Sequence, residues 1–435
     1  MSIQPTITNP MFRDYTRRYQ MIAADFRTQI ESLGLPIDSG LDGMSSSEIL
    51  KSLTAKGIVV ANGGKSLHWN WISPSCIVCR KGVNTATLII STACPNNCFF
   101  CFNPNQGNYE YLRTNKENPA GQLEKWSAEG KRFTDLALTG GEPLLHKPDT
   151  ELFFSTARRL YPNVYTRLYT SGAFLDKEFL SKLKAAGLDE LRFSIKTNAG
   201  QGSMDQALSC IAQSKDYVPN VIVEMPVMPD ELGLMKSLLV ALDDIEIAGI
   251  NLLELCFPFN NTEEYSRRGY KIKAEQFEVL YDYWYAGGLP VSGSEEVCLE
   301  LLGFSADENL RIGVHYCSLE NKLTGQVYQQ NFPYRHEYRF CTMDNEDFFL
   351  KCLKAFGKDV ERIQRILDKA KIKAYYYDNV QGYIAFPLRA AKLLKKQFSE
   401  VELGISFNIV EETPKGHVLR ELKIDYTTFS DGVPC

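Results

Sequence analysis

The sequence has no long apolar run and no excess of positive charge. No window of its 435 residues approaches about 18 uninterrupted apolar residues, the length that a membrane-spanning helix needs. Its N-terminal stretch lacks the apolar segment that marks a secretory signal. Lysine and arginine number 48 against 53 acidic residues, so no global positive field attracts nucleic acid or anionic lipid. We therefore expect a cytoplasmic protein with no membrane and no nucleic-acid partner.

Cysteine, by contrast, is abundant. The chain holds 12 cysteines, and five of them fall between residues 76 and 101. In a cytoplasmic protein such a cluster more often binds a metal or performs chemistry than forms disulfides. Cys210, Cys256 and Cys352 lie on apolar faces of predicted elements, and we expect them in the core. The composition, 44% hydrophobic and 23% charged, is otherwise that of an ordinary globular protein.

Short β-rich runs alternate with amphipathic helices through the middle of the chain. Alternation of this length predicts βα units around a parallel sheet, although periodicity alone does not distinguish a barrel from a doubly wound sheet. The chemically notable residues fall where the strands end, which is where parallel barrels build their sites. This coincidence favours a barrel-like active face. The six predicted strands lie at residues 86–91, 134–140, 164–172, 190–196, 220–229 and 250–257.

The chain is predicted to divide into three parts. Residues 1–72 form an N-terminal helical region, with helices expected at 13–34 and 39–57. Residues 73–330 form the catalytic core, and residues 331–435 form a small C-terminal α+β module. The elements expected in that module are helices at 347–371 and 388–398 and strands at 401–412 and 418–429.

Three cysteines, Cys94, Cys98 and Cys101, have the spacing C-x3-C-x2-C in "STACPNNCFFCFNP". Three thiolates so close together suit an iron–sulfur cluster or a zinc site. A closed structural zinc site needs four ligands, whereas a [4Fe-4S] cluster with three protein thiolates leaves one iron open for another ligand. A zinc knuckle, or buried free thiols, is the alternative interpretation.

This motif, on the loop after the first predicted strand and with Phe100 before its last cysteine, resembles that of the radical S-adenosylmethionine (radical SAM) enzymes. The resemblance implies an α/β fold, a partial (βα)6 TIM-like barrel, and a [4Fe-4S] cluster held by Cys94, Cys98 and Cys101. It also implies that the open iron binds S-adenosylmethionine, whose reductive cleavage gives a 5′-deoxyadenosyl radical that abstracts hydrogen from a substrate. An electron donor such as flavodoxin or ferredoxin would reduce the cluster.

The segment "LTGGEPLLH" stands where radical SAM enzymes carry a glycine-rich motif after the second strand. Glycine permits a close approach of the backbone to a ligand. By resemblance, Gly140, Gly141 and Glu142, followed by Pro143, would contact the methionyl amine. Without the cysteines before it, the triplet would be an ordinary turn signal.

Polar residues at the ends of the later strands are weaker candidates. In similar enzymes a polar residue of the fourth strand helps to hold the cofactor, which suggests Ser194 and Lys196, with Ser171 from "YTSG" beside them. Lys196 could equally be a solvated lysine of the rim. Glu224 and Glu254 end apolar strands, and each could anchor a cofactor hydroxyl, hold a substrate amine or pair with a buried arginine.

A C-x2-C pair, Cys76 and Cys79, precedes the first strand. One such pair is ambiguous between a zinc half-site, a redox pair and part of a second cluster. Together with the distant Cys317, these thiolates could hold an auxiliary [4Fe-4S] cluster whose fourth position is open or filled. Surface thiols and a core cysteine are the alternative. Besides a substrate, the candidates for the fourth ligand are Cys298, Cys341 and His315.

A series of motifs over residues 73–325 is similar to a poorly characterised radical SAM group, described as related to pyruvate formate-lyase activating enzyme. In that group the early CxxC and the late HYC are paired features, which supports one shared cluster. The denser C-terminal cysteines of the SPASM auxiliary-cluster layout are not evident. The motifs are "CxxCxxG", the cysteine triplet, "GGEPLL", "RLYTSG", "NLLELCF", "EYSRRGY", "SEEVCLELL" and "VHYCS".

Three substrate classes remain open. A peptide or protein would suit the C-terminal module, and an amino acid or other small metabolite would suit an auxiliary cluster with an open iron. Glycyl-radical activation fits the resemblance, but dedicated activases are mostly smaller. The alternative outside radical chemistry is a non-enzymatic zinc or iron–sulfur protein, although electron carriers ligate each cubane with four cysteines.

Overall fold

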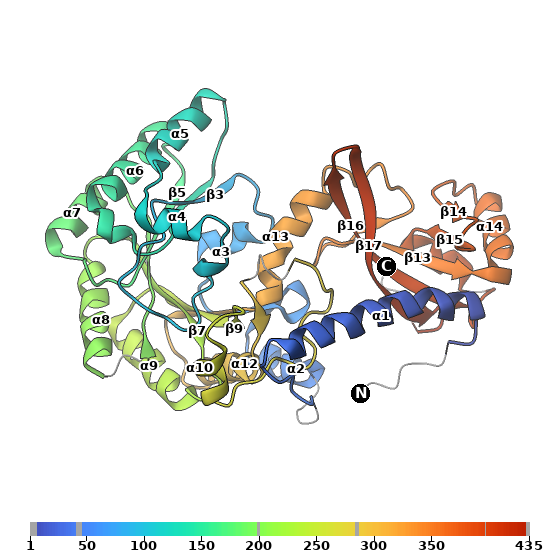
Figure 1. Cartoon of the computed structure of the whole chain (residues 1–435), viewed down its shortest axis with the longest axis horizontal. Helices are drawn as coiled ribbons and strands as arrows, with labels where there is room; N and C mark the ends of the chain where they lie inside the picture. The colour runs from blue at the N-terminus through green and yellow to red at the C-terminus, as the bar shows by residue number, and fades with distance from the viewer. Residues whose placement is uncertain (1–6, 41–45, 198–200, 283–286, 396, 432–435) are drawn as a thin grey trace. The chain divides into compact units, whose positions relative to one another are not determined.

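The chain divides into two compact units (Figure 1). The computed structural model describes residues 7–40, 46–197, 201–282, 287–395 and 397–431. The barrel unit comprises Asp42–Ala274 and Tyr283–Lys322, and the sheet unit comprises Met1–Leu41, Glu275–Asp282 and Leu323–Cys435. Residues 46–72 thus belong with the barrel unit and residues 323–330 with the sheet unit. The division into domains at residues 72 and 330 remains a prediction.

Seven parallel strands form the main sheet of the barrel unit, in the part of the chain that the structure describes. Six of them pair in chain order and confirm the six predicted strands. The seventh pairs in parallel with the sixth. Most residues of β4 to β8 and of β11 are buried, as in a parallel sheet covered on both faces, whereas β3 at the edge buries only Leu88. The seven are β3 (Thr85–Ile89), β4 (Asp135–Thr139), β5 (Tyr165–Thr170), β6 (Glu190–Phe193), β7 (Asn220–Val227), β8 (Gly249–Glu254) and β11 (Gly313–Cys317).

This sheet does not close into a full barrel. Its strand order is β1-β2-β11-β8-β7-β6-β5-β4-β3, and within the described ranges β3 at one edge pairs only with β4. At the other edge, β1 (Val59–Ala61) and β2 (Ser66–Trp69) form a hairpin that runs antiparallel to β11. The fold is therefore α/β, a partial (βα)6 TIM-like barrel with added edge strands.

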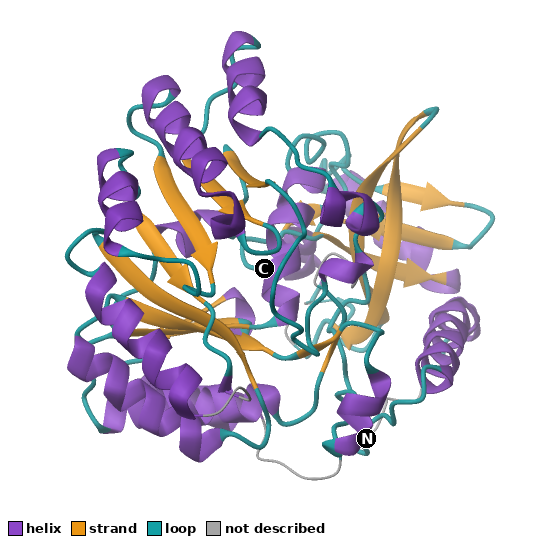
Figure 2. Cartoon of the chain, turned by 60° about the vertical axis from the view of Figure 1, so that its left-hand side comes forward, coloured by secondary structure: helices purple, strands orange, loops and turns teal. Residues whose placement is uncertain are grey.

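Helices cover the outer face of the parallel strands (Figure 2). In α7 (Lys177–Ala185), Asp176 caps the N-terminus by accepting a hydrogen bond from the backbone N–H of Phe179, and the helix buries Phe179, Leu180 and Leu183. No helix in the described part of the chain is both long and apolar enough to span a membrane. The other helices of this unit are α2 (Ser46–Ala55), α3 (Pro74–Cys79), α4 (Tyr109–Thr114), α5 (Pro119–Ala128), α6 (Lys147–Leu160), α8 (Gln201–Ser214), α9 (Leu232–Ile245), α10 (Thr262–Arg267) and α12 (Ser294–Asp307), with the short strands β9 (Cys256–Phe257) and β10 (Leu289–Pro290).

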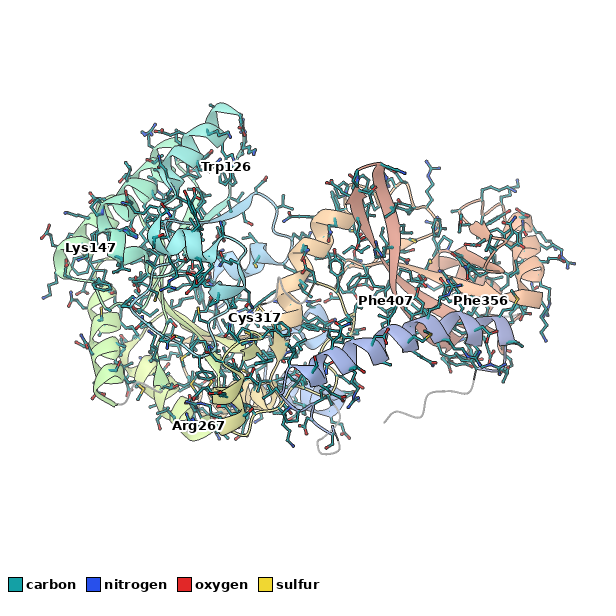
Figure 3. The ribbon with its side chains drawn as sticks, viewed as in Figure 1. Trp126, Lys147, Arg267, Cys317, Phe356 and Phe407 are labelled. Atoms are coloured by element: carbon teal, nitrogen blue, oxygen red, sulfur yellow. The ribbon has the colours of Figure 1, made fainter. Side chains whose placement is uncertain are left out.

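The sheet unit holds an antiparallel sheet, on which Phe356 and Phe407 are labelled in Figure 3. Helix α1 (Pro10–Ser32) packs on this sheet, where the ring of Phe12 stacks on Phe356 with 4.6 Å between centroids. The first N-terminal helix and the C-terminal strands therefore share one core. The strands run β14 (Tyr376–Asp378), β15 (Tyr383–Phe386), β13 (Leu350–Phe356), β16 (Glu402–Thr413) and β17 (Gly416–Thr428), with β12 (Thr342–Met343) beside β13. Helices α13 (Leu319–Asn331), α14 (Val360–Lys369) and α15 (Ala391–Leu394) complete the chain.

One helix predicted for the C-terminal module, residues 347–371, is wrong in its first half. Strand β13 occupies residues 350–356, and only α14 is helical. Every residue of β13 is buried, so its sequence lacks the alternation that marks a half-exposed strand. Lys351 and Lys354, whose charges suggest the polar face of a helix, are ion-paired with acidic side chains. The strands predicted at 401–412 and 418–429 are confirmed as β16 and β17.

Candidate active site

Three of the predicted iron ligands lie on the loop that follows β3, at the carboxyl end of the parallel strands. We call Cys94, Cys98 and Cys101 the mouth triplet. Cys94 is exposed, and Cys98 and Cys101 are half-buried. The backbone N–H of Cys101 donates to the carbonyl of Cys98 at 3.1 Å, which turns the chain between these thiols. At the start of the loop, the N–H of Thr92 donates to the carbonyl of Leu112 in α4 at 3.0 Å.

The glycines of "TGGE" lie directly against this loop. The backbone N–H of Gly141 donates to the carbonyl of Ser91 at 2.9 Å, and that of Glu142 donates to the carbonyl of Ala93 at 2.8 Å. A Cβ on Gly141 would lie 2.0 Å from the Ala93 oxygen. Gly140 has a φ of +118°, and a Cβ there would lie 2.5 Å from the Ser91 oxygen. Because only glycine fits at both positions, the motif fastens the end of β4 to the cysteine loop.

The buried carboxylate of Glu142 joins this turn to the end of β5. It accepts hydrogen bonds from the hydroxyl of Thr170 at 2.7 Å and from the N–H and hydroxyl of Ser171 at 2.8 and 2.6 Å. The N–H of Leu144 donates to it at 3.1 Å, where Pro143 begins a short 3-10 turn. Glu142 and Ser171, both predicted to bind the cofactor, are therefore bound to each other.

Lys196, just beyond β6, lies beside the mouth triplet. Burial raises the pKa of the Cys98 thiol, and the ammonium group of Lys196 opposes that shift through its charge and a hydrogen bond. A cation at this position favours the thiolate, the form of cysteine that binds iron. Ser194, which precedes Lys196 in the chain, donates its backbone N–H to the carbonyl of Thr170 at 3.0 Å.

Aromatic rings support the loop from its other side. Phe100 packs edge-on against Phe99 with centroids 5.2 Å apart, and Phe99 packs edge-on against the buried Tyr265 at 5.1 Å. The side-chain amide of Asn261 donates to the carbonyl of Phe99 at 2.9 Å. Phe100 is thus part of the packing that positions the last cysteine of the triplet.

The CxxC cysteines lie on α3, on the inner side of the sheet (Figure 1). Ser73 caps this helix, and its hydroxyl donates to the Glu190 carboxylate of β6 at 2.6 Å. Ser75 donates to the Asp135 carboxylate of β4 at 2.5 Å. Both carboxylates are buried, so α3 is seated on the inward-facing side chains of two strands.

Arg192 of β6 links α3 to the sheet. Its guanidinium donates to Glu190 and to Glu224, each at 2.5 Å, and to the hydroxyl of Ser73 at 3.1 Å. The nitrogen Nη2 also lies 3.6 Å from the sulfur of Cys76, within hydrogen-bond distance for sulfur. Burial acts to raise the pKa of Glu224, but Arg192 and the Asn251 amide, together with Arg167 and Lys322, hold that pKa below its ordinary value. The ion pair is therefore charged at neutral pH.

A row of side chains continues from β7 across β8 to β11. Asn251 Nδ2 donates to Glu224 at 2.7 Å and lies 3.3 Å from the sulfur of Cys76. Asn251 Oδ1 accepts a hydrogen bond from His315 Nδ1 at 3.0 Å, and His315 Nε2 bonds with the hydroxyl of Ser66 at 3.0 Å. Burial lowers the pKa of His315 to about 3. The ring is neutral and both nitrogens are used, so His315 is not available as a fourth cluster ligand.

Cys317 ends β11 and is labelled in Figure 3. The side-chain amide of Asn321 donates to its sulfur at 3.3 Å. Burial raises the pKa of Cys317 to about 12, Lys322 and Asn321 act to lower it, and the charges of Cys79 and Cys76 act to raise it. These mutual effects mean that Cys76, Cys79 and Cys317 lie within electrostatic reach of one another. We call them the inner triplet.

Two other candidates for a fourth ligand have different surroundings. Successive residues of a strand point to opposite faces, so Tyr316 points away from the face of Cys317. Tyr316 donates to Glu295 of α12 at 3.1 Å, and α12 carries the buried Cys298. Cys298 therefore lies on the outer side of the sheet, opposite the face of the inner triplet, although its thiol too is within electrostatic reach of Cys317. Cys341 belongs to the sheet unit.

A second buried arginine faces Cys79. Cys79 is exposed to solvent, yet desolvation still raises the pKa of its thiol, and Arg167 and Arg192 act to lower it. Arg167 is 8% exposed and pairs with Asp135 at 3.3 Å, and its Nε has no hydrogen-bond partner among the described residues. The buried N–H of Arg167 needs a hydrogen-bond acceptor, and the negatively charged sulfurs of an iron–sulfur cluster could serve as one. The donors around Cys79 are therefore compatible with an iron–sulfur cluster.

No three His, Cys, Asp or Glu side chains in the described ranges converge on a point where one metal ion could be held. A tetrahedral zinc site would need such a point, with sulfur about 2.3 Å from the metal. In a cubane each thiolate binds a different iron atom, so its thiolates share no single point. Both cubane sites consequently remain predictions.

Glu254 ends β8 as predicted, whereas Glu224 lies in the middle of β7 because that strand continues to Val227, and protein groups engage both carboxylates. Glu224 pairs with Arg192, and Glu254 accepts the N–H of Leu319 at 2.8 Å and pairs with Lys273 at 3.5 Å. Pairing with a buried arginine, one of three sequence-based alternatives, thus describes Glu224, whereas Glu254 pairs with a lysine. Contact of Glu224 with a cofactor remains a prediction. Of the three predicted core cysteines, Cys256 and Cys352 are buried and Cys210 is half-buried.

The sequence-based site omitted three residues that surround the inner triplet: Arg167, Arg192 and Asn251. A signal for the arginines was present, because each stands in the middle of a strand predicted for the parallel sheet, in "VYTRLYT" and "ELRF". A buried arginine needs acidic partners. Asn251 carried no comparable signal.

Residues 88–232 match the family model described as "Radical SAM superfamily". This segment runs from β3 to the first residue of α9 and contains both the mouth triplet and the "TGGE" turn. The chain carries a radical SAM domain. A domain of this family implies a [4Fe-4S] cluster and S-adenosylmethionine, and the three thiols with their neighbouring glycine turn fit that requirement.

Two curated relatives of this radical SAM chain are named as enzymes, which supports the same class for it. A protein of Methanocaldococcus jannaschii named "Putative glycyl-radical enzyme activating enzyme" is 24% identical over 324 residues, which cover 70% of this chain and 80% of the relative. A PqqA peptide cyclase of Gluconobacter oxydans is 35% identical over 116 residues, which cover 25% of this chain and 29% of the relative. The chain is thus a radical SAM enzyme.

Among solved structures, SuiB of Streptococcus suis bound to the precursor peptide SuiA has a TM-score of 0.39 and 12% identity, over 70% of this chain and 61% of that chain. BtrN in complex with AdoMet and 2-DOIA has a TM-score of 0.26 and 19% identity, over 33% of this chain and 56% of that chain. The radical SAM chain described here therefore spans less than two thirds of either solved chain.

Proposed function

We propose that this radical SAM enzyme abstracts hydrogen from a peptide, a protein or an amino-acid-like substrate. When bound together, a reduced [4Fe-4S] cluster and S-adenosylmethionine supply the 5′-deoxyadenosyl radical for this step. The observation that carries the proposal is the backbone pairing of Gly141 with Ser91 and of Glu142 with Ala93. It holds the backbone of the glycine turn against the loop that carries three free thiols, so that a ligand on an open iron would lie beside the turn.

In this proposal each residue of the barrel mouth has a separate role. The mouth triplet holds the cluster, Lys196 stabilises the negative charge of the thiolates, and Phe100 positions the last cysteine. The glycine turn offers its backbone to the methionyl group, while the bonds of Glu142 to β5 keep the turn in place. The residues proposed to contact S-adenosylmethionine are Phe100, Gly140, Gly141, Glu142, Pro143, Ser171, Ser194, Lys196 and Glu224.

The inner triplet is proposed to hold a second [4Fe-4S] cluster. Support comes from the mutual charge effects among its thiols, from the N–H donors around Cys76 and Cys317, and from the unused Nε of Arg167. His315 and Cys298 are unavailable as a fourth ligand. The fourth iron is therefore proposed to be open to substrate, where an amine and a carboxylate could chelate it.

A peptide substrate is favoured by one relative's name, since the cyclase of Gluconobacter oxydans is named for the peptide PqqA. Glycyl-radical activation is the second candidate, because the relative from Methanocaldococcus jannaschii, named for that activity, covers 70% of this chain. The electron donor is proposed to be a flavodoxin or a ferredoxin.

The experiment is anaerobic reconstitution with iron and sulfide, followed by reduction with dithionite in the presence of S-adenosylmethionine. We expect 5′-deoxyadenosine and methionine in equal amounts, detected by chromatography. Protein that carries iron but forms no 5′-deoxyadenosine would overturn the proposal. Addition of a glycyl-radical enzyme as substrate, with detection of its radical by electron paramagnetic resonance (EPR), would decide for the second candidate.

A further inference from the structure

Three side-chain N–H groups point at the sulfurs of the inner triplet. Arg192 Nη2 and Asn251 Nδ2 lie 3.6 and 3.3 Å from the sulfur of Cys76. Asn321 Nδ2 lies 3.3 Å from the sulfur of Cys317. Two of the three thiols in this group therefore accept hydrogen bonds from neutral amides, and one of these two also accepts a bond from a guanidinium.

The orientation of each amide is set by a partner at its other end. Asn251 Oδ1 accepts a hydrogen bond from His315, so the Nδ2 group of Asn251 must face Cys76. Asn321 Oδ1 accepts a hydrogen bond from Asn62 Nδ2 at 2.8 Å, so its own Nδ2 faces Cys317. Neither amide can turn over without losing a bond at both ends.

Arg192 is held just as firmly. Its other donors are occupied by Glu190 and Glu224, and the side chains of Arg192 and Asn251 are almost completely buried. Donors fixed in advance around a sulfur atom favour the state in which that sulfur carries more negative charge. In an iron–sulfur cluster this is the reduced state, because hydrogen bonds to the sulfurs are among the factors that set its potential.

We propose that Arg192, Asn251 and Asn321 raise the reduction potential of the second cluster through N–H···S hydrogen bonds. They are positioning residues, and the assignment rests on the proposed second cluster. It predicts that the inner cluster accepts an electron more readily than it would with the same cysteines and no such donors.

The test removes each donor while the thiols stay. In a Cys98→Ala background, which removes the mouth cluster, the variants Asn251→Leu, Asn321→Leu and Arg192→Lys are reconstituted anaerobically. The midpoint potential of the remaining cluster is measured by EPR during redox titration. Each variant should lower the potential, and a tenfold loss of preference for the reduced state corresponds to about 59 mV for one electron. Asn220→Leu is the matched control, because its amide donates to Tyr165 and Asp189 and to no sulfur.

The existence of the second cluster and the tuning of its potential are tested by different outcomes. If the Cys98→Ala protein binds no iron, the second cluster itself is wrong. If it binds a cluster whose potential in the Asn321→Leu variant equals that of the Asn220→Leu control, the tuning role is wrong. Asn321 is half-buried, so this variant keeps the test available should Asn251→Leu or Arg192→Lys fail to fold.

Discussion

The two cysteine triplets of the barrel unit are held in different ways. The mouth triplet lies on a loop that is fastened largely by backbone hydrogen bonds to "TGGE", with Lys196 as a neighbouring cation. The inner triplet is surrounded by charged and amide side chains from β6, β7, β8 and α13. Backbone support by itself places no charged side chain against the thiols of a loop, whereas a side-chain network fixes the local charge around its sulfurs. The first arrangement suits a cluster that must bind a cofactor, and the second suits a cluster whose potential is set by the protein.

The largest expected effect is the loss of one cluster in each variant, which distinguishes the two triplets by their function. Cys98→Ala should abolish S-adenosylmethionine cleavage and lower the iron content from about eight to about four atoms per chain. The double variant Cys76→Ala with Cys79→Ala should lose the same amount of iron. Iron analysis of anaerobically reconstituted proteins makes the measurement. Equal iron content in the double variant and the wild type would contradict the assignment of a cluster to the inner triplet.

The next effect tests the backbone fastening of the mouth. In Gly141→Ala the new Cβ would lie 2.0 Å from the Ala93 oxygen, so the turn and the cysteine loop must separate. We expect a stability loss of about 1–3 kcal/mol and at least a tenfold slower formation of 5′-deoxyadenosine. Thermal unfolding and a timed assay measure the two.

Gly233→Ala is the matched control, because nothing lies within 4 Å of its Cβ position in α9. Alanine in a helix should be neutral or stabilising by up to about 1 kcal/mol. If both variants behave alike, the close approach of Gly141 does not matter.

A third effect tests the charge network of the inner triplet. Glu224→Gln leaves Arg192 with one buried partner fewer, which should cost about 3–5 kcal/mol at neutral pH. Glu124→Gln breaks an exposed pair with Arg159 and should change stability by less than about 1 kcal/mol. Denaturant unfolding of both variants makes the comparison.

The pH dependence of this effect has a definite sign. The folded-state pKa of Glu224 is lowered, so its contribution is present above an unfolded pKa of about 4.3 and is lost as the pH falls through the folded pKa. The stability gap between wild type and Glu224→Gln should therefore close in acid. A gap that stays constant down to the acid limit of folding would contradict the assignment of a charged Glu224.

The smallest effect concerns one bond to the mouth loop. Asn261 has a φ of +55° and donates to the carbonyl of Phe99. Asn261→Gly keeps the left-handed backbone and removes this bond together with the exposed bond of the same amide to Asn260, so we expect a loss of about 1 kcal/mol and a few-fold slower cleavage. An unchanged cleavage rate would mean that the aromatic packing of Phe99 alone holds the loop.

Local sequence was sufficient where burial and pairing were regular. The parallel strands are short β-rich runs that alternate with amphipathic helices, and six of them were predicted with ends that differ from the observed ones by only a few residues. Strand β13 was missed because it is also buried on both faces and carries Lys351 and Lys354 at helical spacing. Lys351 pairs with Asp347 four residues earlier, a spacing that also suits a helix, and the partner of Lys354 is the distant Glu421, so no local pattern separates this strand from a helix.

The residues of the candidate site also differ in how far the sequence alone could predict them. The mouth triplet and "TGGE" are compact motifs, so their residues could be named from the sequence. The donors around the inner triplet depend on the register that sets Glu224 beside Asn251 and Asn251 beside His315, and on the seating of α3. Those pairings join residues far apart in the chain, so local patterns in the sequence do not predict them.

The most direct test of the central claim, that one triplet performs the cleavage and the other does not, is the 5′-deoxyadenosine formed by two reconstituted variants. The Cys76→Ala, Cys79→Ala protein should still cleave S-adenosylmethionine under dithionite, and the Cys98→Ala protein should not. Cleavage of S-adenosylmethionine by the Cys98→Ala protein would contradict the account. So would the absence of cleavage by iron-loaded wild type.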